Sequence, residues 1–349
     1  MGWLLLLGVL IWLAGGWLDV SRGRRGAVLA ALWALITGAL ALLPPGHVLA
    51  QAWGPLSAWL ILGGVVLLVL GYMRGLALLK TRVREEPAPD GPQPLFSDAE
   101  LARYARHIVL RELGGPGQKK LKEASVLVIG AGGLGAPALL YLAAAGVGRI
   151  GIVDDDEVSL SNLQRQVVHG DADVGDAKVF SATRRLKALN PHVEIRPYKR
   201  RFDDAIAAEL LADYDLILDG SDNFDTRYLS NRTAVAAGKP LVSGALSQWE
   251  GQLSVFHPAS GAPCYACIFP EAPAEGLAPS CAEAGVVAPL PGVVGAMMAG
   301  EAVKLITGAG AALRGEMMIY DALWGETRKI ALKRRPGCPV CGATDEVTP

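Results

Sequence analysis

The segment from Ser125 to Asp156 constrains the fold of this chain more than any other. It reads SVLVIGAGGLGAPALLYLAAAGVGRIGIVDDD, in which a short apolar run (Val126–Ile129) leads into glycines with the spacing G-x-G-x-x-G. An Ala/Leu-rich helical pattern follows, and a second apolar run, Ile150–Val153, ends in acidic residues. This order predicts a strand, a phosphate-binding turn, a helix and a second strand.

The glycine turn predicts a nucleotide site. Glycines let the backbone turn tightly and bring amide N–H groups close to a phosphate, at the positive end of the helix that begins there. Asp154, at the end of the second apolar run, is placed to accept hydrogen bonds from ribose hydroxyls. The turn alone does not identify the nucleotide, because NAD enzymes, flavoproteins and some ATP-using enzymes share it.

The first 80 residues predict a membrane region. Six of the eight tryptophans lie in the first 60 residues, and three runs without charge are about as long as a bilayer core: Met1–Leu18, Gly26–Leu43 and Trp53–Met73. A removable signal peptide fits less well, because no basic segment or cleavage site accompanies the first run. A buried helical hairpin of a soluble domain is the other alternative.

The positions of the basic residues predict the orientation. Arg22, Arg24 and Arg25 follow the first run, and Arg74, Lys80, Arg82 and Arg84 follow the third. The positive-inside rule therefore places the N-terminus outside and residues from Arg82 onward in the cytoplasm. We expect the protein in the inner (cytoplasmic) membrane, with residues 1–80 as three transmembrane helices, 81–96 as a linker and 97–349 as a domain facing the cytoplasm.

Charge argues against a nucleic-acid partner. Outside residues 1–80 the chain keeps 28 of its 33 bases and 33 of its 34 acids, so it lacks the excess of positive charge that binding to phosphate backbones requires. The Pro-rich segment 85–94 predicts an extended spacer. Ser97 and Glu100 then have the spacing of a capping box, which predicts the start of a helix.

Strand and helix patterns alternate after the glycine turn. Apolar runs at Val193–Ile195, Leu216–Leu218 and Leu241–Val242 alternate with helical patterns at Lys178–Leu189, Asp203–Ala212 and Thr226–Ala237. This alternation predicts an α/β fold with a mostly parallel sheet covered on both faces. From Leu253 onward the pattern is less regular.

Polar side chains that suit a triphosphate follow the strands. Asn162, Arg165 and Lys178 come soon after Asp154, and Arg and Lys can neutralise phosphate charge as pyrophosphate leaves. Each one alone is equally compatible with a solvated surface residue. Asp222 follows the strand at Leu216–Leu218, where it is suited either to bind magnesium or to cap the next helix.

The cysteines predict a metal site. Cys264 and Cys267 form one C-x-x-C pair, and Cys338 and Cys341 form another, which is typical of a tetrahedral zinc site that joins the end of the chain to its middle. Redox dithiols are the alternative. Cys281 is left without a partner cysteine, in a Pro/Gly/Ala-rich segment.

Together these motifs resemble the MoeB/ThiF/HesA group of bacterial adenylyltransferases, relatives of the ubiquitin-activating enzymes. The resemblance runs from Ser97 to Gly342 through nine segments in the same order: RYARHIVL, GAGGLG, DDDEVSLSNLQRQ, GDAKV, LDGSDNFDTR, GQLSVF, CYACIFP, SCAEAGVVAPLPGVVG and CPVCG. It implies a Rossmann-like ATP-binding domain in a homodimer, acting on a small ubiquitin-fold sulfur carrier that ends in Gly-Gly.

The resemblance also implies roles for single residues. Phosphate and ribose binding would involve Gly130, Gly132, Gly133, Gly135, Asp154, Asn162, Arg165 and Lys178. Asp222 would bind magnesium, Arg106 would reach into the ATP site of the partner subunit, and the four paired cysteines would hold zinc. The candidate catalytic residues are therefore Arg106, Arg165, Lys178, Asp222 and Cys281.

The implied reaction is adenylation of the carrier's C-terminal carboxylate by ATP with release of pyrophosphate, which needs no side-chain base. That agrees with the five histidines, which form no motif with a nucleophile. We expect the carrier of molybdopterin synthase, in molybdenum cofactor biosynthesis, with sulfur from an external rhodanese or cysteine desulfurase, because only eight residues follow Cys341. The alternatives are the thiamine thiazole carrier, with Cys281 in sulfur transfer, and a membrane-tethered docking module without catalysis.

Overall fold

The computed structural model describes residues 2–18, 20–44, 47–83, 94–274 and 284–342. By its internal contacts the chain divides into two compact units, Met1–Gln93 and Pro94–Pro349.

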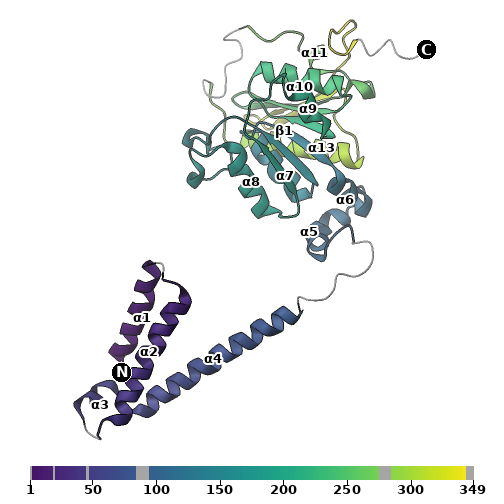
Figure 1. Ribbon diagram of the computed structural model, residues 1–349. Helices are drawn as coiled ribbons and strands as arrows, with labels where there is room; N and C mark the ends of the chain where they lie inside the picture. Colours follow the sequence, from purple (N-terminus) through teal and green to yellow (C-terminus); the bar gives the residue numbers. More distant parts are fainter. Residues whose placement is uncertain (1, 19, 45–46, 84–93, 275–283, 343–349) are drawn as a thin grey trace. The chain divides into compact units, whose positions relative to one another are not determined.

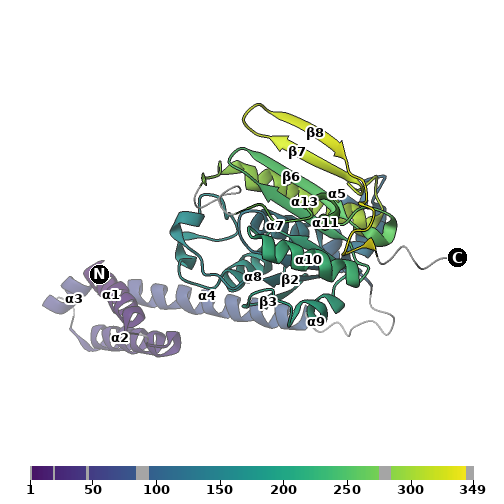
Figure 2. The ribbon, with the colours of Figure 1, turned by 90° about the horizontal axis from the view of Figure 1, so that it is seen from above.

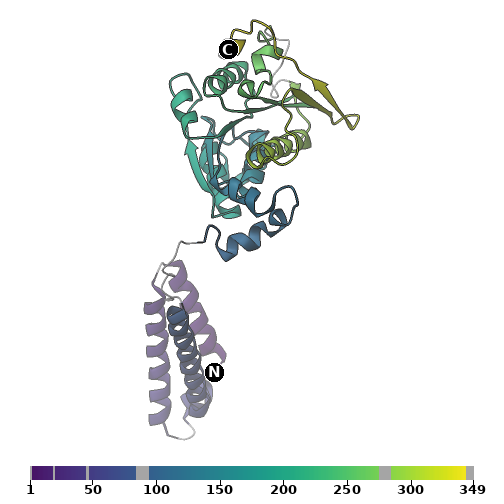
Figure 3. The same cartoon turned by 90° about the vertical axis from the view of Figure 1, so that its right-hand side faces the viewer.

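The first unit consists of helices (Figures 1 and 3): α1 (Gly2–Trp17), α2 (Arg22–Leu42), α3 (Val48–Trp53) and α4 (Leu56–Val83). Tryptophans join α2, α3 and α4, since Trp33 Nε1 donates to the carbonyl oxygen of Trp59 and Trp59 Nε1 donates to that of Trp53, each at 2.9 Å. A Cβ at Gly63 would collide with the Trp33 ring, so glycine permits this close approach of α4 to α2. Much of the apolar surface of α4 remains exposed.

Three apolar N-terminal helices are present, as predicted, and the structure adds the short helix α3 to the second connection. By length and composition, three helices among the described residues could cross a membrane: Gly23–Leu42, Leu56–Leu76 and Pro289–Thr307. The first lies in α2 and the second in α4. The third is half buried and belongs to the second unit. The 16 residues of α1 extend about 24 Å, less than the roughly 30 Å of a bilayer core.

The second unit is built on one eight-stranded sheet, in the order β3-β2-β1-β4-β5-β6-β7-β8. Its strands are β1 (Ser125–Ile129), β2 (Arg149–Val153), β3 (Glu194–Tyr198), β4 (Leu216–Asp219), β5 (Leu241–Leu246), β6 (Glu250–Phe256), β7 (Glu316–Asp321) and β8 (Glu326–Ala331). Strands β1 to β5 pair in parallel, and β6, β7 and β8 extend the sheet antiparallel. Figure 2 shows β7 and β8 beyond β6 at one end of the sheet.

Helices cover both faces of the parallel part (Figure 1). On one face α7 (Gly135–Ala145), α8 (Lys178–Leu189) and α13 (Pro289–Thr307) pack against alternate strand residues such as Val128 and Ile150. On the other face, α9 (Ala207–Ala212) and α10 (Phe224–Ala236) pack against the strand residues that point the opposite way, such as Leu127. Strands buried on both faces explain the continuous apolar runs of the sequence.

The remaining helices are short or lie at the edge of the domain. They are α5 (Asp98–Ile108), α6 (Gly114–Glu123), α11 (Tyr265–Ile268) and the 3₁₀ turns η1 (Leu160–Asn162), η2 (Asp171–Asp173) and η3 (Pro258–Ser260). The predicted capping box is confirmed, because Ser97 Oγ accepts from the Glu100 N–H and Glu100 Oε2 accepts from the Ser97 N–H. The α/β fold with a mostly parallel sheet is also confirmed.

Candidate nucleotide site and metal centre

The glycine turn joins β1 to α7, and its glycines are required for different reasons. Gly130 has a φ of 89°, a conformation that side chains disfavour. A Cβ at Gly135 would collide with the carbonyl oxygen of Gly130. Gly132 and Gly133 line a cavity of about 700 Å³ at the carboxyl ends of the strands, a volume typical of small-molecule sites. The turn therefore brings main chain to the wall of a nucleotide-sized cavity.

No side chain caps the N-terminus of α7, whose N-cap residue is Leu134. Among the described residues, nothing accepts a hydrogen bond from the N–H groups of Gly132 and Gly133. Free N–H groups at the positive end of a helix suit an anion.

Asp154 holds this turn in place. Its Oδ2 accepts from the Ala131 N–H at 2.7 Å, and its Oδ1 accepts from the Asp156 N–H at 2.8 Å. Burial raises the pKa of Asp154, although the nearby Lys178 charge and these two N–H groups act against that rise. Asp154 also lines the cavity, as its predicted contact with ribose requires.

Lys178 begins α8 and reaches the same cavity. Its side chain is only 5% exposed, and its Nζ lies 2.6 Å from Oδ2 of Asp156, a carboxylate that is 68% exposed. A buried ammonium and free backbone N–H groups that line the same cavity together attract phosphate electrostatically.

Arg165 lines the cavity, whereas Asn162 is not among the lining residues. The Oδ1 of Asn162 instead accepts from an Arg165 guanidinium nitrogen at 2.9 Å. Asn162 therefore orients Arg165 in this structure, and its predicted phosphate contact stays a prediction.

Asp222 lines the cavity at the end of β4 and is exposed. It does not cap the next helix, because Asn223 fills that place and accepts from the Thr226 N–H at 2.9 Å. Helix capping, the structural alternative that the sequence left open for Asp222, is therefore carried out by Asn223.

Buried Arg227 fixes the loop that carries Asp222. One guanidinium nitrogen donates to the Ser221 carbonyl oxygen at 2.5 Å, and another donates to that of Gly244 in β5 at 2.8 Å. The same nitrogen lies 3.9 Å from Oδ2 of the fully buried Asp219, and this oxygen has no hydrogen-bond partner in the described structure, whereas Oδ1 accepts from the N–H and the hydroxyl of Ser221.

Sequence reasoning missed Arg200, Arg201 and Gln166, which also line the cavity. The basic run Lys199–Arg201, four residues beyond the predicted strand Val193–Ile195 and directly after β3, was a usable signal, because ligands bind beyond the carboxyl ends of parallel strands. The burial of Gln166 depends on tertiary contacts and had no such signal.

Two candidate catalytic residues lie apart from this group. Arg106 is exposed in the last turn of α5 and does not line the cavity. Cys281 lies outside the described residues.

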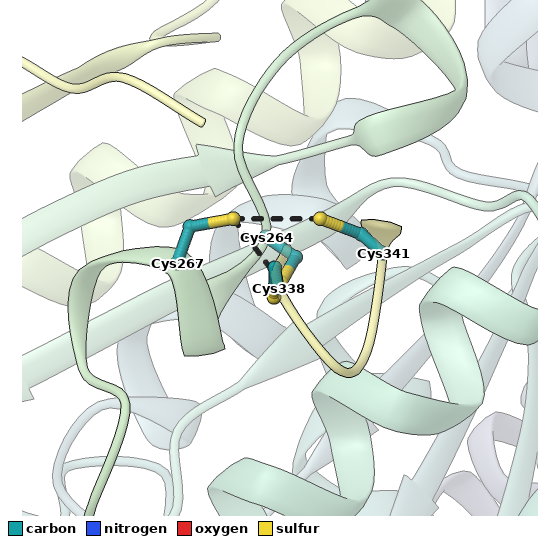
Figure 4. A group of neighbouring side chains, drawn as sticks. All are labelled: Cys264, Cys267, Cys338 and Cys341. Carbon is teal, nitrogen blue, oxygen red and sulfur yellow. Dashed lines mark hydrogen bonds between the residues drawn. The ribbon is translucent and has the colours of Figure 1, made fainter. Parts of the chain in front are cut away.

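Figure 4 shows the four paired cysteines converging from two segments, one at the short helix α11 and one near the end of the described chain. All are buried, and three Sγ–Sγ distances are 3.7, 3.7 and 3.4 Å. Tetrahedral zinc with Zn–S bonds of about 2.3 Å requires about 3.8 Å between sulfurs, whereas a disulfide requires about 2.0 Å. Burial raises the pKa of the Cys264 thiol, so an uncompensated thiolate there is unfavourable and a cation would offset the cost. The cluster therefore fits zinc rather than a dithiol pair.

The comparison with protein families settles the membership of the chain. The model of the ThiF family matches residues 104–340, which include the glycine turn, Arg165, Lys178, Asp222 and three of the four clustered cysteines, Cys264, Cys267 and Cys338. The chain belongs to the ThiF family.

Two relatives match this chain over most of its length. The chain is 52% identical over 257 residues to the sulfur carrier protein adenylyltransferase of Thermus thermophilus, covering 72% of this chain and 94% of that protein. It is 52% identical over 251 residues to the probable adenylyltransferase/sulfurtransferase MoeZ of Mycobacterium tuberculosis, covering 71% of this chain but only 64% of MoeZ.

A solved structure supports the ThiF-type fold. Escherichia coli MccB, crystallised with MccA-N7isoASN, has a TM-score of 0.61 and 23% identity, covering 69% of this chain and 74% of that one. At this identity the likeness concerns the fold alone.

Proposed function

We propose that this chain transfers the adenylyl group of ATP to the C-terminal carboxylate of a small ubiquitin-fold sulfur carrier ending in Gly-Gly. The observation that carries the proposal is the similarity to the Thermus adenylyltransferase, which extends over nearly that whole protein. The cavity supports it, because it joins a glycine turn with cationic and acidic side chains.

The chemistry suits these residues. A carboxylate oxygen of the carrier attacks the α-phosphorus of ATP, the bond from that phosphorus to the bridging oxygen breaks, and pyrophosphate leaves with the negative charge. A carboxylate is already a nucleophile at neutral pH, so the chain has to align the reactants and neutralise charge. Arg165 and Lys178 supply positive charge at the cavity wall.

The other nucleotide contacts follow from position. Gly130, Gly132, Gly133 and Gly135 would bind phosphate through the turn, with Asn162 as a further contact. Asp154 would bind the ribose, and Asp222 would bind magnesium, which lowers the charge of the triphosphate. The exposure of Asp222 at the cavity supports that role.

Zinc would be structural. Cys264, Cys267, Cys338 and Cys341 would use all four positions of a tetrahedral ion, so that no position remains for water or substrate. The metal would join the loop after β6 to the end of the chain.

Arg106 would act in a homodimer, reaching into the partner's cavity. Its exposure and its absence from the lining of its own chain's cavity are compatible with that role. Mixing Arg106→Ala chains with Asp222→Ala chains should restore some adenylation. A mixture as inactive as either variant would contradict the shared site.

We propose the molybdopterin synthase small subunit as the type of carrier, within molybdenum cofactor biosynthesis. Sulfur would come from an external rhodanese or cysteine desulfurase. The alternative is the thiazole carrier with Cys281 in sulfur transfer. A reductant-sensitive adduct between carrier and Cys281, lost together with sulfuration in Cys281→Ser, would favour that alternative.

Residues 1–80 would anchor the enzyme in the inner membrane, and residues 81–96 would link this anchor to the catalytic domain. Residues 97–349 would form that domain, in the cytoplasm. The exposed apolar surfaces of α2 and α4 support the anchor. Three spans require that α1 crosses as well, despite its length. Reporters fused after Val48 and after Pro94 should give external and cytoplasmic signals, respectively. A cytoplasmic signal at Val48 would contradict three spans.

The direct test is to incubate full-length protein in detergent with ATP, Mg²⁺ and carriers ending in Gly-Gly, and to look for the carrier adenylate by mass spectrometry. We expect an adenylate with at least one carrier. Binding of a carrier without any adenylate would instead support a docking module.

A further inference from the structure

We propose that His169 is a positioning residue for the nucleotide: it holds the Ala131 carbonyl oxygen away from the cavity and thereby directs the Gly132 N–H at the phosphates. The inference rests on the proposed function, because it needs ATP in the cavity.

The His169 ring links α8 to the glycine turn. It is 8% exposed, with Nε2 3.0 Å from the carbonyl oxygen of Ala131 and Nδ1 2.8 Å from Oγ of Ser181. Ser181 in turn lies 2.9 Å from Oδ2 of Asp173. The ring therefore touches the turn on one side and an anchored polar pair on the other.

The partners determine which nitrogen carries hydrogen. A carbonyl oxygen can only accept, so Nε2 must donate to Ala131. The Ser181 hydroxyl can either donate to Nδ1 or accept from it, and it adapts to whichever form the ring takes. The hydroxyl has one hydrogen and the Asp173 carboxylate can only accept, so while Ser181 donates to Asp173 it accepts from Nδ1 of a charged ring, and it donates to Nδ1 of the neutral ring only by giving up the bond to Asp173. Burial lowers the pKa of His169, which favours the neutral ring. In both forms the bond to Ala131 remains.

The direction of the Gly132 N–H follows from peptide geometry. The described peptide bonds are trans, so the C=O of Ala131 and the N–H of Gly132 point in opposite directions across one plane. The carbonyl points inward to the buried ring. The Gly132 N–H therefore points outward. Gly132 lines the cavity, and its N–H has no acceptor in the described structure.

Ala131 is held on both sides. Its N–H donates to Asp154 Oδ2 at 2.7 Å, while its C=O accepts from His169. Without the His169 bond, the plane between Ala131 and Gly132 could rotate and present an oxygen to the phosphates, which repels an anion. Preorganised donors bind charge without that reorganisation cost.

Three substitutions separate the hydrogen bond from the bulk of the ring. In His169→Gln the side-chain amide nitrogen takes the place of Nε2 and keeps the donor to Ala131. In His169→Asn the amide is too short to reach Ala131 but can still meet Ser181, and His169→Phe fills the volume without a donor. His257→Asn is the matched control, because His257 Nε2 also meets a backbone carbonyl, that of Gly238 at 3.2 Å, outside the cavity.

The measurement is the affinity of the full-length protein for ATP by calorimetry and for adenosine by competition. We expect His169→Asn and His169→Phe to bind ATP about tenfold or more weakly, with adenosine binding unchanged, since adenosine has no phosphate. The KM for ATP should rise by a similar factor with a smaller change in kcat. His169→Gln and His257→Asn should stay within about threefold of wild type.

Equal weakening of ATP and adenosine would reduce His169 to a structural residue and overturn the proposal. Unchanged ATP binding in both donor-free variants, or no rescue by His169→Gln, would also overturn it. A wild-type protein that binds ATP but adenylates no carrier would contradict the proposed function and leave the positioning role standing. A wild-type protein that binds no ATP would contradict both.

Discussion

The ammonium of Lys178 lies 2.6 Å from the carboxylate of Asp156 at the wall of the nucleotide cavity. The lysine is almost fully buried and the aspartate is mostly exposed, so Asp156 is the direct ion-pair partner that, together with the nearby Asp154 carboxyl, compensates a buried charge in the absence of nucleotide. A bound phosphate can take over that task.

This relationship predicts that Asp156→Asn destabilises the nucleotide-free protein more than the ATP-bound protein. We expect the thermal midpoint to fall by a few degrees without ATP and to recover with ATP and Mg²⁺, while Lys178→Met lowers adenylation by about 100-fold or more. Scanning calorimetry with and without ATP measures the difference. An equal fall in both states would mean that Asp156 has no such role.

Asp222 and Arg165 should be needed for chemistry rather than for folding, because both line the cavity and neither belongs to the buried core. Asp222→Ala and Arg165→Ala should lower pyrophosphate exchange by about 100-fold or more, with thermal midpoints within about 2 °C of wild type. Asp225→Ala, another exposed aspartate at the start of α10, is the matched control and should remain active. Activity near wild type in Asp222→Ala would remove it from the site.

The cysteine cluster should hold one zinc per chain. Cys338→Ser should release the metal and lower the thermal midpoint by roughly 10 °C or more, because a structural metal contributes directly to folding. Cys281→Ser is the control cysteine and should keep the metal. Pure wild-type protein without zinc in elemental analysis would refute the assignment.

Asp173 should make stability depend on acid pH. The Arg184 guanidinium, which lies 2.6 Å from its Oδ1, together with the Gly170 N–H and the Ser181 hydroxyl, lowers the pKa of Asp173 to about 2. The unfolded-state pKa is about 3.9, so the stabilisation is present above about pH 4 and is lost as the pH falls toward 2.

Thermal midpoints of wild type and Asp173→Asn from pH 7 to pH 3 test this linkage. The gap between them should be constant above about pH 5 and should narrow below pH 4. A gap that widens on acidification would have the wrong sign.

The parallel half of the fold could be predicted because its signals are local. The β1–α7–β2 unit carries its glycines, apolar runs and helix pattern within one continuous segment, and α8 has the predicted bounds, Lys178–Leu189. The antiparallel half could not be predicted, because β6 contains Gly251, Gln252 and Ser254 and its pairing with β7 joins distant segments. Such pairing is decided by tertiary packing.

The site divides in the same way. Asp154, Arg165, Lys178 and Asp222 follow strands in sequence, so their gathering at one edge of the sheet could be predicted, and C-x-x-C spacing indicated the cysteine cluster. Arg227 could not be predicted as a support of the Asp222 loop, because its acceptor at Gly244 lies on another strand. The contact of His169 with Ala131 likewise joins residues that no local pattern connects.

The most direct test of the central claim is ATP–pyrophosphate exchange by the full-length protein with a carrier that ends in Gly-Gly and with the same carrier lacking its last glycine or bearing a C-terminal amide. We expect exchange with the intact carrier, at least about 100-fold slower exchange with either altered carrier, and none without carrier, because the terminal carboxylate is the nucleophile. Exchange that is as fast with the amidated carrier as with the intact one would contradict the proposed adenylation. The absence of exchange with every carrier tested would contradict it as well.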